Sequence, residues 1–153
     1  MLRLSADTVE ELSRHAQDTF PDECCGAVIA RAGQESVWRI TNVQNVLHEK
    51  DPESYPRDAT IAYFMEPKEL LAVMKETDSG AATLKALYHS HPNHDAYFSA
   101  EDKARAMFGD EPSYPDTAYL VISIYERQIK AIRAYRWNEA TKDFVEDEVS
   151  TRV

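Results

Sequence analysis

The sequence TLKALYHSHPNHDAYFSAED occupies residues 83–102 and predicts a strand followed by a helix. The apolar first part is typical of a strand, and it carries His89 and His91 at its C-terminal end. Residues two apart in a strand project from the same face, so we expect both imidazoles to point the same way. Pro92 ends the strand, and Ser99 restarts the chain as a helix, which turns it back toward the histidines.

A carboxylate on that helix completes a candidate metal site. Zinc accepts imidazole nitrogen and carboxylate oxygen, and a site with three protein ligands keeps a fourth position for water. We therefore interpret His89, His91 and Asp102 as candidate ligands of Zn²⁺. Because zinc lowers the pKa of bound water to about 7, this set predicts a metal hydrolase. Taken alone, Ser99 and Asp102 also match the capping box of an ordinary helix start.

Composition narrows the class of protein and its partners. The chain has 153 residues, 43% hydrophobic and 29% charged, which predicts a single domain over residues 1–153. Its net charge of -10 disfavours nucleic acid and anionic membrane surfaces as partners. The N-terminal residues have no signal-peptide pattern, and no apolar run is long enough to span a bilayer. We expect a cytoplasmic protein with no nucleic-acid or membrane partner.

Helical and strand patterns alternate along the chain. The order predicts an α/β or α+β fold with a mixed sheet flanked by helices. Residues 118–124 are apolar on both faces, which is typical of a central strand. The predicted elements are helices at 5–20, 67–77 and 99–108, strands at 27–30, 37–40, 83–88, 118–124 and 129–137, a long loop at 42–62, and a final acidic strand or tail at 143–149.

The two cysteines predict no disulfide framework. Cys24 and Cys25 are adjacent, and a disulfide between neighbours closes a strained ring. We interpret them as reduced, partly buried packing residues. Nucleobase deaminases, which also use zinc-activated water, need His-X-Glu and a Pro-Cys-X-X-Cys pair. The chain has neither at its histidines, so the deaminase hypothesis fails.

The whole pattern resembles the JAMM (MPN-plus) metalloprotease family. That family's motif is an upstream glutamate, then His-Ser/Thr-His-Pro, then Ser-X-X-Asp beginning seven residues after the proline. The chain has Glu23, residues 89–92 as His-Ser-His-Pro, and Ser99 with Asp102 at that spacing. Residues 21–26, Pro-Asp-Glu-Cys-Cys-Gly, also look like the compact prokaryotic branch of the family. The resemblance implies a JAMM-like mixed sheet with layering similar to that of cytidine deaminases.

The resemblance also implies a division of roles among five residues. His89, His91 and Asp102 would hold zinc, Glu23 would accept the proton of the attacking water, and Ser99 would stabilise the oxyanion. Glu23 is assigned by the family pattern alone, since many Asp and Glu residues could serve as a base.

The resemblance further implies hydrolysis of the peptide or isopeptide bond after the C-terminal Gly-Gly of a ubiquitin-like or sulfur-carrier protein. A short chain leaves little room for the insertions that grip linked ubiquitin, which favours a sulfur-carrier protein or its C-terminal amino-acid adduct as the substrate. Two alternatives stay open: a non-catalytic MPN-type interaction module, and a zinc hydrolase of small amides. Phe98 stands where relatives often have proline, so the loop before Ser99 has its own shape.

Overall fold

A six-stranded mixed sheet forms the centre of the computed structural model, which describes residues 1–152. Its strand order is β3-β2-β4-β7-β8-β9, and only the β4–β7 pair within it is parallel. A parallel β1–β10 pair and a β5–β6 hairpin accompany it. The strands are β1 Leu2–Ser5, β2 Cys25–Arg31, β3 Gln34–Ile40, β4 Thr83–Pro92, β5 Met107–Phe108, β6 Glu111–Pro112, β7 Ala118–Tyr125, β8 Gln128–Asn138, β9 Asp143–Asp147 and β10 Val149–Arg152. The helices are α1 Ala6–Thr19, α2 Gln44–Lys50, α3 Pro67–Asp78 and α4 Ala100–Arg105.

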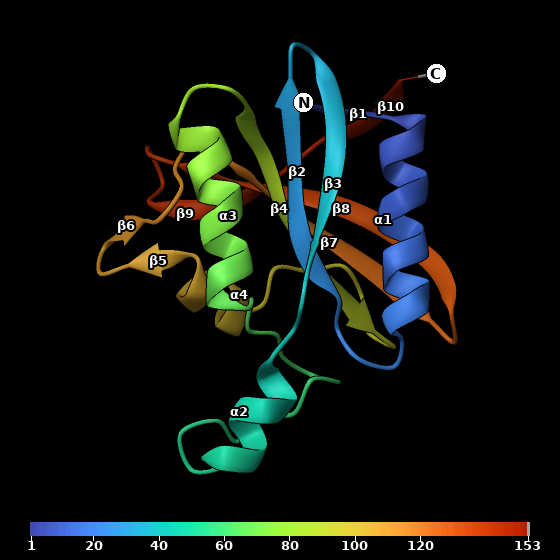
Figure 1. Ribbon diagram of the computed structural model, residues 1–153, viewed down its shortest axis with the longest axis vertical. Helices are drawn as coiled ribbons and strands as arrows, with labels where there is room; N and C mark the ends of the chain where they lie inside the picture. Colours follow the sequence, from blue (N-terminus) through green and yellow to red (C-terminus); the bar gives the residue numbers. More distant parts are fainter. Residues whose placement is uncertain (153) are drawn as a thin grey trace.

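Helix α1 covers one face of the sheet (Figure 1). Ser5 caps it by accepting a hydrogen bond from the backbone N–H of Thr8. Leu12 and Ala16 are fully buried and pack against even-numbered residues of β4 and β7. The alternation of side chains along a strand therefore sends the even-numbered positions of β4 toward α1.

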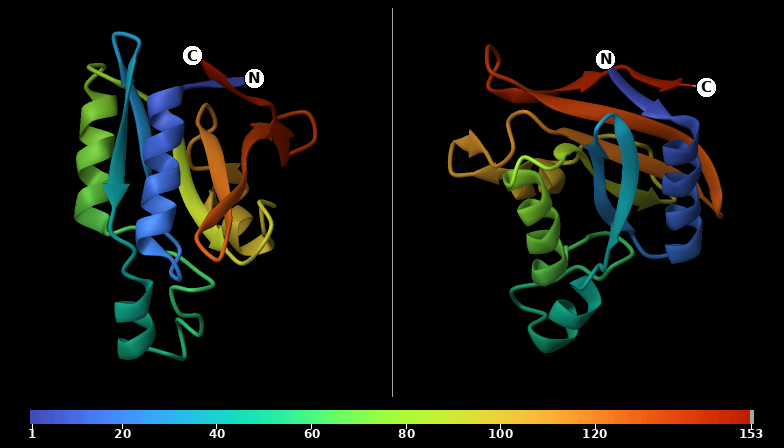
Figure 2. Two further views of the ribbon diagram at one scale, coloured as in Figure 1. Left: turned by 90° about the vertical axis from the view of Figure 1, so that its right-hand side faces the viewer. Right: turned by 45° about the horizontal axis from the view of Figure 1, so that its top comes forward.

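Helices α3 and α4 cover the opposite face, which gives three layers (Figures 1 and 2). Val73 of α3 and Ala106, just after α4, belong to this second core together with Leu87 of β4. Strand β4 lies between β2 and β7 at the middle of the sheet. This arrangement confirms the predicted class of fold, with a mixed sheet between helical layers.

The structure differs from the predicted elements in four places. Residues 2–5 form β1, which pairs with β10 at the other end of the chain, so no local sequence pattern predicted this strand. The predicted loop at 42–62 contains α2, whose first turn is held by the Asn42 side chain accepting from the Gln44 N–H. The predicted helix at 99–108 ends at Arg105, because Met107 and Phe108 pair with β6 instead. The final acidic segment divides into β9 and β10.

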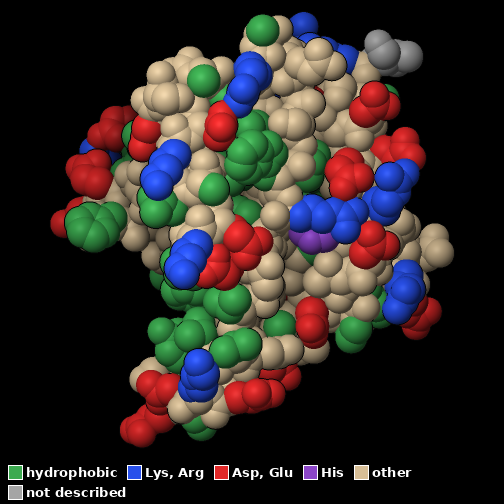
Figure 3. Space-filling model, in the orientation of Figure 1, with side chains coloured by type: hydrophobic (Ala, Val, Ile, Leu, Met, Phe, Trp, Pro, Cys, Tyr) green, Lys and Arg blue, Asp and Glu red, His purple; other side chains and the backbone are tan. Residues whose placement is uncertain are grey.

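The segment around α2 projects from one end of the body (Figures 1 and 2). The molecule is indented between this projection and the body, and hydrophobic side chains gather there (Figure 3). Acidic and basic side chains are intermixed over the rest of that face (Figure 3). Among the described helices, none combines the length and the apolar character that crossing a membrane requires.

Candidate metal centre

Strand β4 places two histidines on the face that α4 covers. His89 and His91 share the parity of Leu87, while Ser90 between them points to the α1 side and accepts a hydrogen bond from the Cys24 N–H at 2.8 Å. Both imidazoles are buried, with 1% of His89 and 6% of His91 exposed. The ring of Tyr63 stacks on that of His89 at a centroid distance of 4.5 Å.

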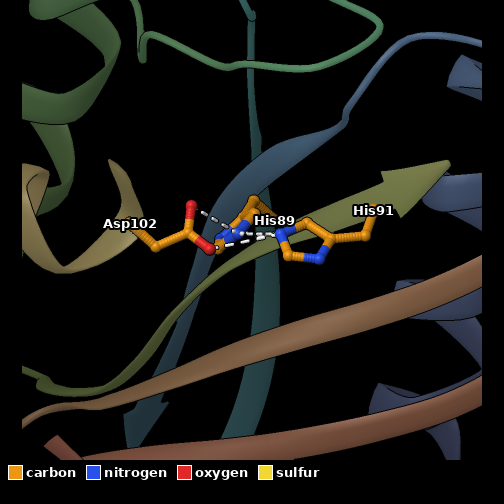
Figure 4. A group of neighbouring side chains, drawn as sticks. All are labelled: His89, His91 and Asp102. Carbon is orange, nitrogen blue, oxygen red and sulfur yellow. Dashed lines mark hydrogen bonds and ion pairs between the residues drawn. The ribbon is translucent and has the colours of Figure 1, made fainter. Parts of the chain in front are cut away.

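Asp102 reaches the histidines from the first turn of α4. Its Oδ1 lies 3.1 Å from Nε2 of His89, and its Oδ2 lies 3.2 Å from Nε2 of His91 (Figure 4). The capping box is also real, since Ser99 and Asp102 exchange side-chain-to-backbone hydrogen bonds of 3.0 Å. The two interpretations of these residues are therefore compatible: the cap fixes the carboxylate that faces the imidazoles.

The hydrogen bonds at this cluster turn acceptor atoms of different side chains toward one another. Nδ1 of His91 lies 2.8 Å from the carbonyl oxygen of Asp95, which can only accept, so this nitrogen carries the ring proton. In this tautomer the lone pair of His91 Nε2 faces Asp102 Oδ2, another acceptor, and the same nitrogen lies 3.1 Å from His89 Nε2. Acceptors that converge in a buried space repel one another unless a cation lies between them.

The spacing of the three side chains suits a tetrahedral ion. Their ligand atoms all lie within 4.8 Å of one another, and the three closest separations are 3.1, 3.1 and 3.2 Å. Zinc bonds of about 2.0 Å at tetrahedral angles separate neighbouring ligand atoms by roughly 3.3 Å. The Asp95 carbonyl orients His91 in the way that outer hydrogen bonds orient metal-binding histidines. The chain thus has a His-His-Asp set that could bind a metal ion.

Burial and neighbouring charges tune the ionisation of this set. Burial lowers the pKa of His89, against the opposing charge of Asp102, so the ring is neutral at pH 7. Burial disfavours the charged form of Asp102, but its contact with His89 and the hydrogen bond from the Ser99 N–H outweigh it and hold its pKa well below its usual range. Neutral imidazoles and an ionised carboxylate are the forms that bind metal.

Glu23 lies beside this cluster in the segment between α1 and β2. Its backbone is fixed by hydrogen bonds from its N–H to Ala59 and from the Asn42 side chain to its carbonyl, and 5% of the residue is exposed. Burial, followed by the negative charge of Asp102, raises the pKa of Glu23 to about 9. Added positive charge nearby would lower that pKa and favour the carboxylate form.

A cleft of about 320 Å³ gives solvent access to the cluster, and we call it the site cleft. Glu23, His91, Ser99 and Asp102 all line it, while His89 lies deeper. Ser99 Oγ accepts from the Asp102 N–H, which leaves its own hydroxyl proton free to donate into the cleft. The structure therefore brings together all five residues singled out from the sequence, and their roles stay predictions.

Other residues noted in the sequence divide between the cleft and the core. Tyr97 and the exposed His94 line the site cleft, and the Tyr97 ring meets His91 edge-on at 5.2 Å. Tyr88 points to the α1 side and bonds to His15. Burial raises the pKa of Cys24 to about 12, and that of Cys25 is raised by the same cause, so both thiols stay protonated.

Tyr63, Arg57 and Arg105 are among the lining residues that were missed at the sequence level. Arg57 belongs to the segment predicted as a loop, Tyr63 directly follows that segment, and Arg105 looked like an ordinary charge at a helix end. Their proximity to the histidines depends on how that segment folds over α4, which no short-range pattern encodes.

The fold and the cluster define a three-layer protein with a candidate metal centre, and comparison with known proteins gives its family. The chain belongs to the prokaryotic homologs of the JAB domain, whose family profile matches residues 5–140. This membership confirms the resemblance to the JAMM (MPN-plus) proteins.

Two curated relatives resemble the chain over most of its length. The chain is 30% identical over 126 residues to the desampylase of Haloferax volcanii, covering 80% of each protein. It is 27% identical over 136 residues to the CysO-cysteine peptidase of Mycobacterium tuberculosis, covering 89% of this chain and 82% of the relative.

Two solved structures share the fold. One is a protein from Desulfitobacterium hafniense, at 23% identity and a TM-score of 0.72, covering 99% of this chain and 93% of that one. The other is a JAB1/MPN domain protein from Archaeoglobus fulgidus, at 14% identity and a TM-score of 0.52, covering 99% and 97%.

Proposed function

We propose that this chain is a zinc-dependent peptidase or isopeptidase that hydrolyses the bond after the C-terminal Gly-Gly of a ubiquitin-like or sulfur-carrier protein. The observation that carries the proposal is the buried His-His-Asp set with converging acceptors, placed beside Glu23 at a solvent-accessible cleft. The names of the desampylase and CysO-cysteine peptidase relatives support the substrate class.

His89, His91 and Asp102 are the residues that would hold zinc, and the tetrahedral spacing of their ligand atoms fits it. Zinc bound there would act as a Lewis acid on the scissile carbonyl and lower the pKa of water to about 7. The Asp95 carbonyl fixes the tautomer of His91, and the Ser99 cap fixes Asp102, so the ligand atoms are held in position before any ion enters.

Glu23 would take the proton of the attacking water and return it to the leaving amine. A carboxylate does this best when its pKa lies near the working pH, and burial has already raised that of Glu23. Ser99 would donate a hydrogen bond from its hydroxyl to the oxyanion that develops on the oxygen of the scissile carbonyl. Its Oγ is fixed by the Asp102 N–H, so the donor is already oriented.

The test replaces Glu23 and keeps the ligands. Zinc-loaded wild type is incubated with a carrier protein extended past its Gly-Gly end, and the product is identified by mass spectrometry. Glu23→Gln is expected to bind one zinc per chain and to lose about 10²- to 10⁴-fold in rate, the usual contribution of a general base. Glu10→Gln, which removes an exposed carboxylate on α1, is the matched control and should keep full activity.

Two results would reject the proposal. Cleavage by Glu23→Gln at the wild-type rate would show that Glu23 is not the general base. Zinc-loaded wild type that cleaves neither peptide-linked nor isopeptide-linked Gly-Gly adducts would favour the non-catalytic interaction module.

A further inference from the structure

Two arginines line the same cleft as the candidate metal ligands. Arg57 comes from the segment after α2, and Arg105 is the last residue of α4. They are the two cationic side chains among the described lining residues, which also include the acidic Glu23, Glu101 and Asp102. Arginine presents a planar fork of donors that matches a carboxylate.

The guanidinium group of Arg105 is fixed by its neighbours and, within the described part of the chain, keeps N–H donors without a partner. Its guanidinium carbon lies 5.8 Å from the ring centre of Tyr63 and 5.5 Å from that of Phe64, so the group rests against two aromatic rings. Its Nε is buried and has no hydrogen-bond partner among residues 1–152. Tyr63 in turn stacks on His89, which ties the position of this guanidinium to a candidate metal ligand.

The only carboxylate that the described residues place against both arginines is that of Glu101, and its contacts are loose. Arg105 Nη2 lies 3.4 Å from Glu101 Oε1, and Arg57 Nε lies 3.8 Å from Glu101 Oε2. Good charge-assisted hydrogen bonds are about 2.7–2.9 Å long. The two guanidinium groups thus retain most of their capacity for a second carboxylate in the cleft.

The proposed substrate restricts where that carboxylate can come from. Two glycines before the scissile bond carry no side chain, so an acidic residue upstream of them lies three or more residues away, roughly 10 Å along an extended tail. On the other side of the bond, a single released amino acid carries its α-carboxylate on the carbon next to the scissile nitrogen. A lysine joined through its side-chain nitrogen offers no carboxylate at that distance.

We infer that Arg57 and Arg105 bind the free α-carboxylate of a single amino acid attached to the Gly-Gly end. The inference rests on the proposed function and narrows its substrate: the chain prefers a peptide-linked amino-acid adduct to an isopeptide-linked protein. A cleft of about 320 Å³ is near the lower end of the range for ligand pockets, which suits a leaving group of one residue.

A purely electrostatic role for the arginines makes a different prediction. Both guanidinium charges lower the pKa of Glu23, so their loss could slow the reaction by weakening its base form. That effect would be the same for every substrate. Binding of the leaving group instead changes the ratio between substrates with and without the carboxylate.

The test compares three substrates that share one carrier tail. The first ends in Gly-Gly plus one amino acid with a free carboxylate, the second has the same residue as a carboxamide, and the third is linked to a lysine side chain. Wild type is expected to cleave the first about 10- to 100-fold better in kcat/KM, as for loss of a hydrogen bond to a charged group. An upstream carboxylate, present in all three, would give no such preference.

Variants of the two arginines test whether these residues cause the preference for the free carboxylate. Arg57→Gln and Arg105→Gln should bring the ratio of the first two substrates toward one, and Arg105→Lys should restore it only partly because lysine lacks the fork. Arg57 is half exposed, so its replacement keeps the test valid if Arg105→Gln unfolds the chain. Arg14→Gln on the surface of α1 is the control and should keep the wild-type ratio.

Binding gives a readout independent of turnover. Zinc-loaded Glu23→Gln should bind the free-acid peptide about 10- to 100-fold more tightly than the carboxamide in calorimetry. Equal affinities, or variants that slow both substrates equally, would overturn the inference. Failure to cleave any of the three substrates would instead reject the proposed function, and the binding comparison would still decide the role of the arginines.

Discussion

Both faces of β4 carry buried polar side chains, but the hydrogen-bond partners of these side chains differ between the two faces. On the α1 side, the Tyr88 hydroxyl bonds to His15 Nδ1 at 2.6 Å, and Ser90 accepts from the Cys24 N–H at 2.8 Å. On the α4 side, His89 and His91 turn ring nitrogens toward each other and toward a carboxylate. On the α1 face of β4, other protein groups therefore satisfy the buried polar side chains. On the α4 face, acceptor atoms of the buried side chains face one another.

The difference separates structural polar groups from a candidate ligand site. Burial alone does not, because His15, like His89, is buried and has a pKa lowered by burial. His15 has a single partner that can both donate and accept, so protein atoms satisfy it. His91 has a fixed donor on one side, and its other ring nitrogen faces the Asp102 carboxylate, which can only accept. The second arrangement could bind a cation, whereas protein atoms alone satisfy the first.

The largest expected effect is stabilisation by zinc. An ion that binds only the folded state raises the free energy of unfolding by about 4 kcal/mol at a thousandfold excess over its Kd. Urea unfolding of wild type with zinc and with a chelator should show this difference. The His89→Ala/His91→Ala double variant should lose it, while Tyr88→Phe, on the other face, should retain it. Undiminished zinc in the double variant would show that the ligand assignment is wrong.

Next is the hydroxyl of Ser99, which both caps α4 and faces the cleft. Glycine at an N-cap costs only a few tenths of a kcal/mol, whereas it removes the oxyanion donor completely. Ser99→Gly should therefore unfold at nearly the wild-type urea concentration yet lose about 10²- to 10³-fold in rate. Ser99→Thr keeps cap and donor and should recover most activity. Equal activity of the glycine and wild-type enzymes would leave Ser99 as a cap alone.

What could be predicted from sequence follows the range of the interactions. The shared face of His89 and His91 is a local consequence of strand alternation, and the Ser99 cap lies three residues from its partner, so both were visible. Tyr63 reaches His89 only through the fold of residues 42–66, where the α2 turn and Asn42 hydrogen bonds hold the chain. The β1–β10 pair joins the two ends of the chain and was equally hidden.

The α1 face should show its own pH dependence through His15. Burial, followed by the charge of Arg39, lowers the pKa of His15 to about 4, against the opposing charges of Glu11 and Asp18. The unfolded chain, with a pKa near 6.5, then binds the proton more readily. Stability is complete above pH 6.5, falls as the pH drops, and the loss of about 2–3 kcal/mol is complete below pH 4.

Measuring that loss requires a variant that does not titrate. Urea unfolding in chelator at pH 7 and pH 4 should show a smaller decrease for His15→Gln than for wild type, because every other group is common to both. Glutamine can still bond to the Tyr88 hydroxyl. Identical decreases in the two proteins would mean that His15 takes up its proton as readily in the folded chain as in the unfolded one.

The smallest effect tests whether the two faces are independent. Ser90→Ala leaves the buried Cys24 N–H without its acceptor, which costs about 1–2 kcal/mol in the free energy of unfolding. Ser54→Ala, at an exposed position, should cost nothing measurable. Zinc content of Ser90→Ala should stay at one per chain, because the hydroxyl points away from the imidazoles that flank it in sequence. Loss of zinc with this variant would mean that the hydrogen bond to Cys24 also holds β4 in the register that aligns His89 and His91 with Asp102.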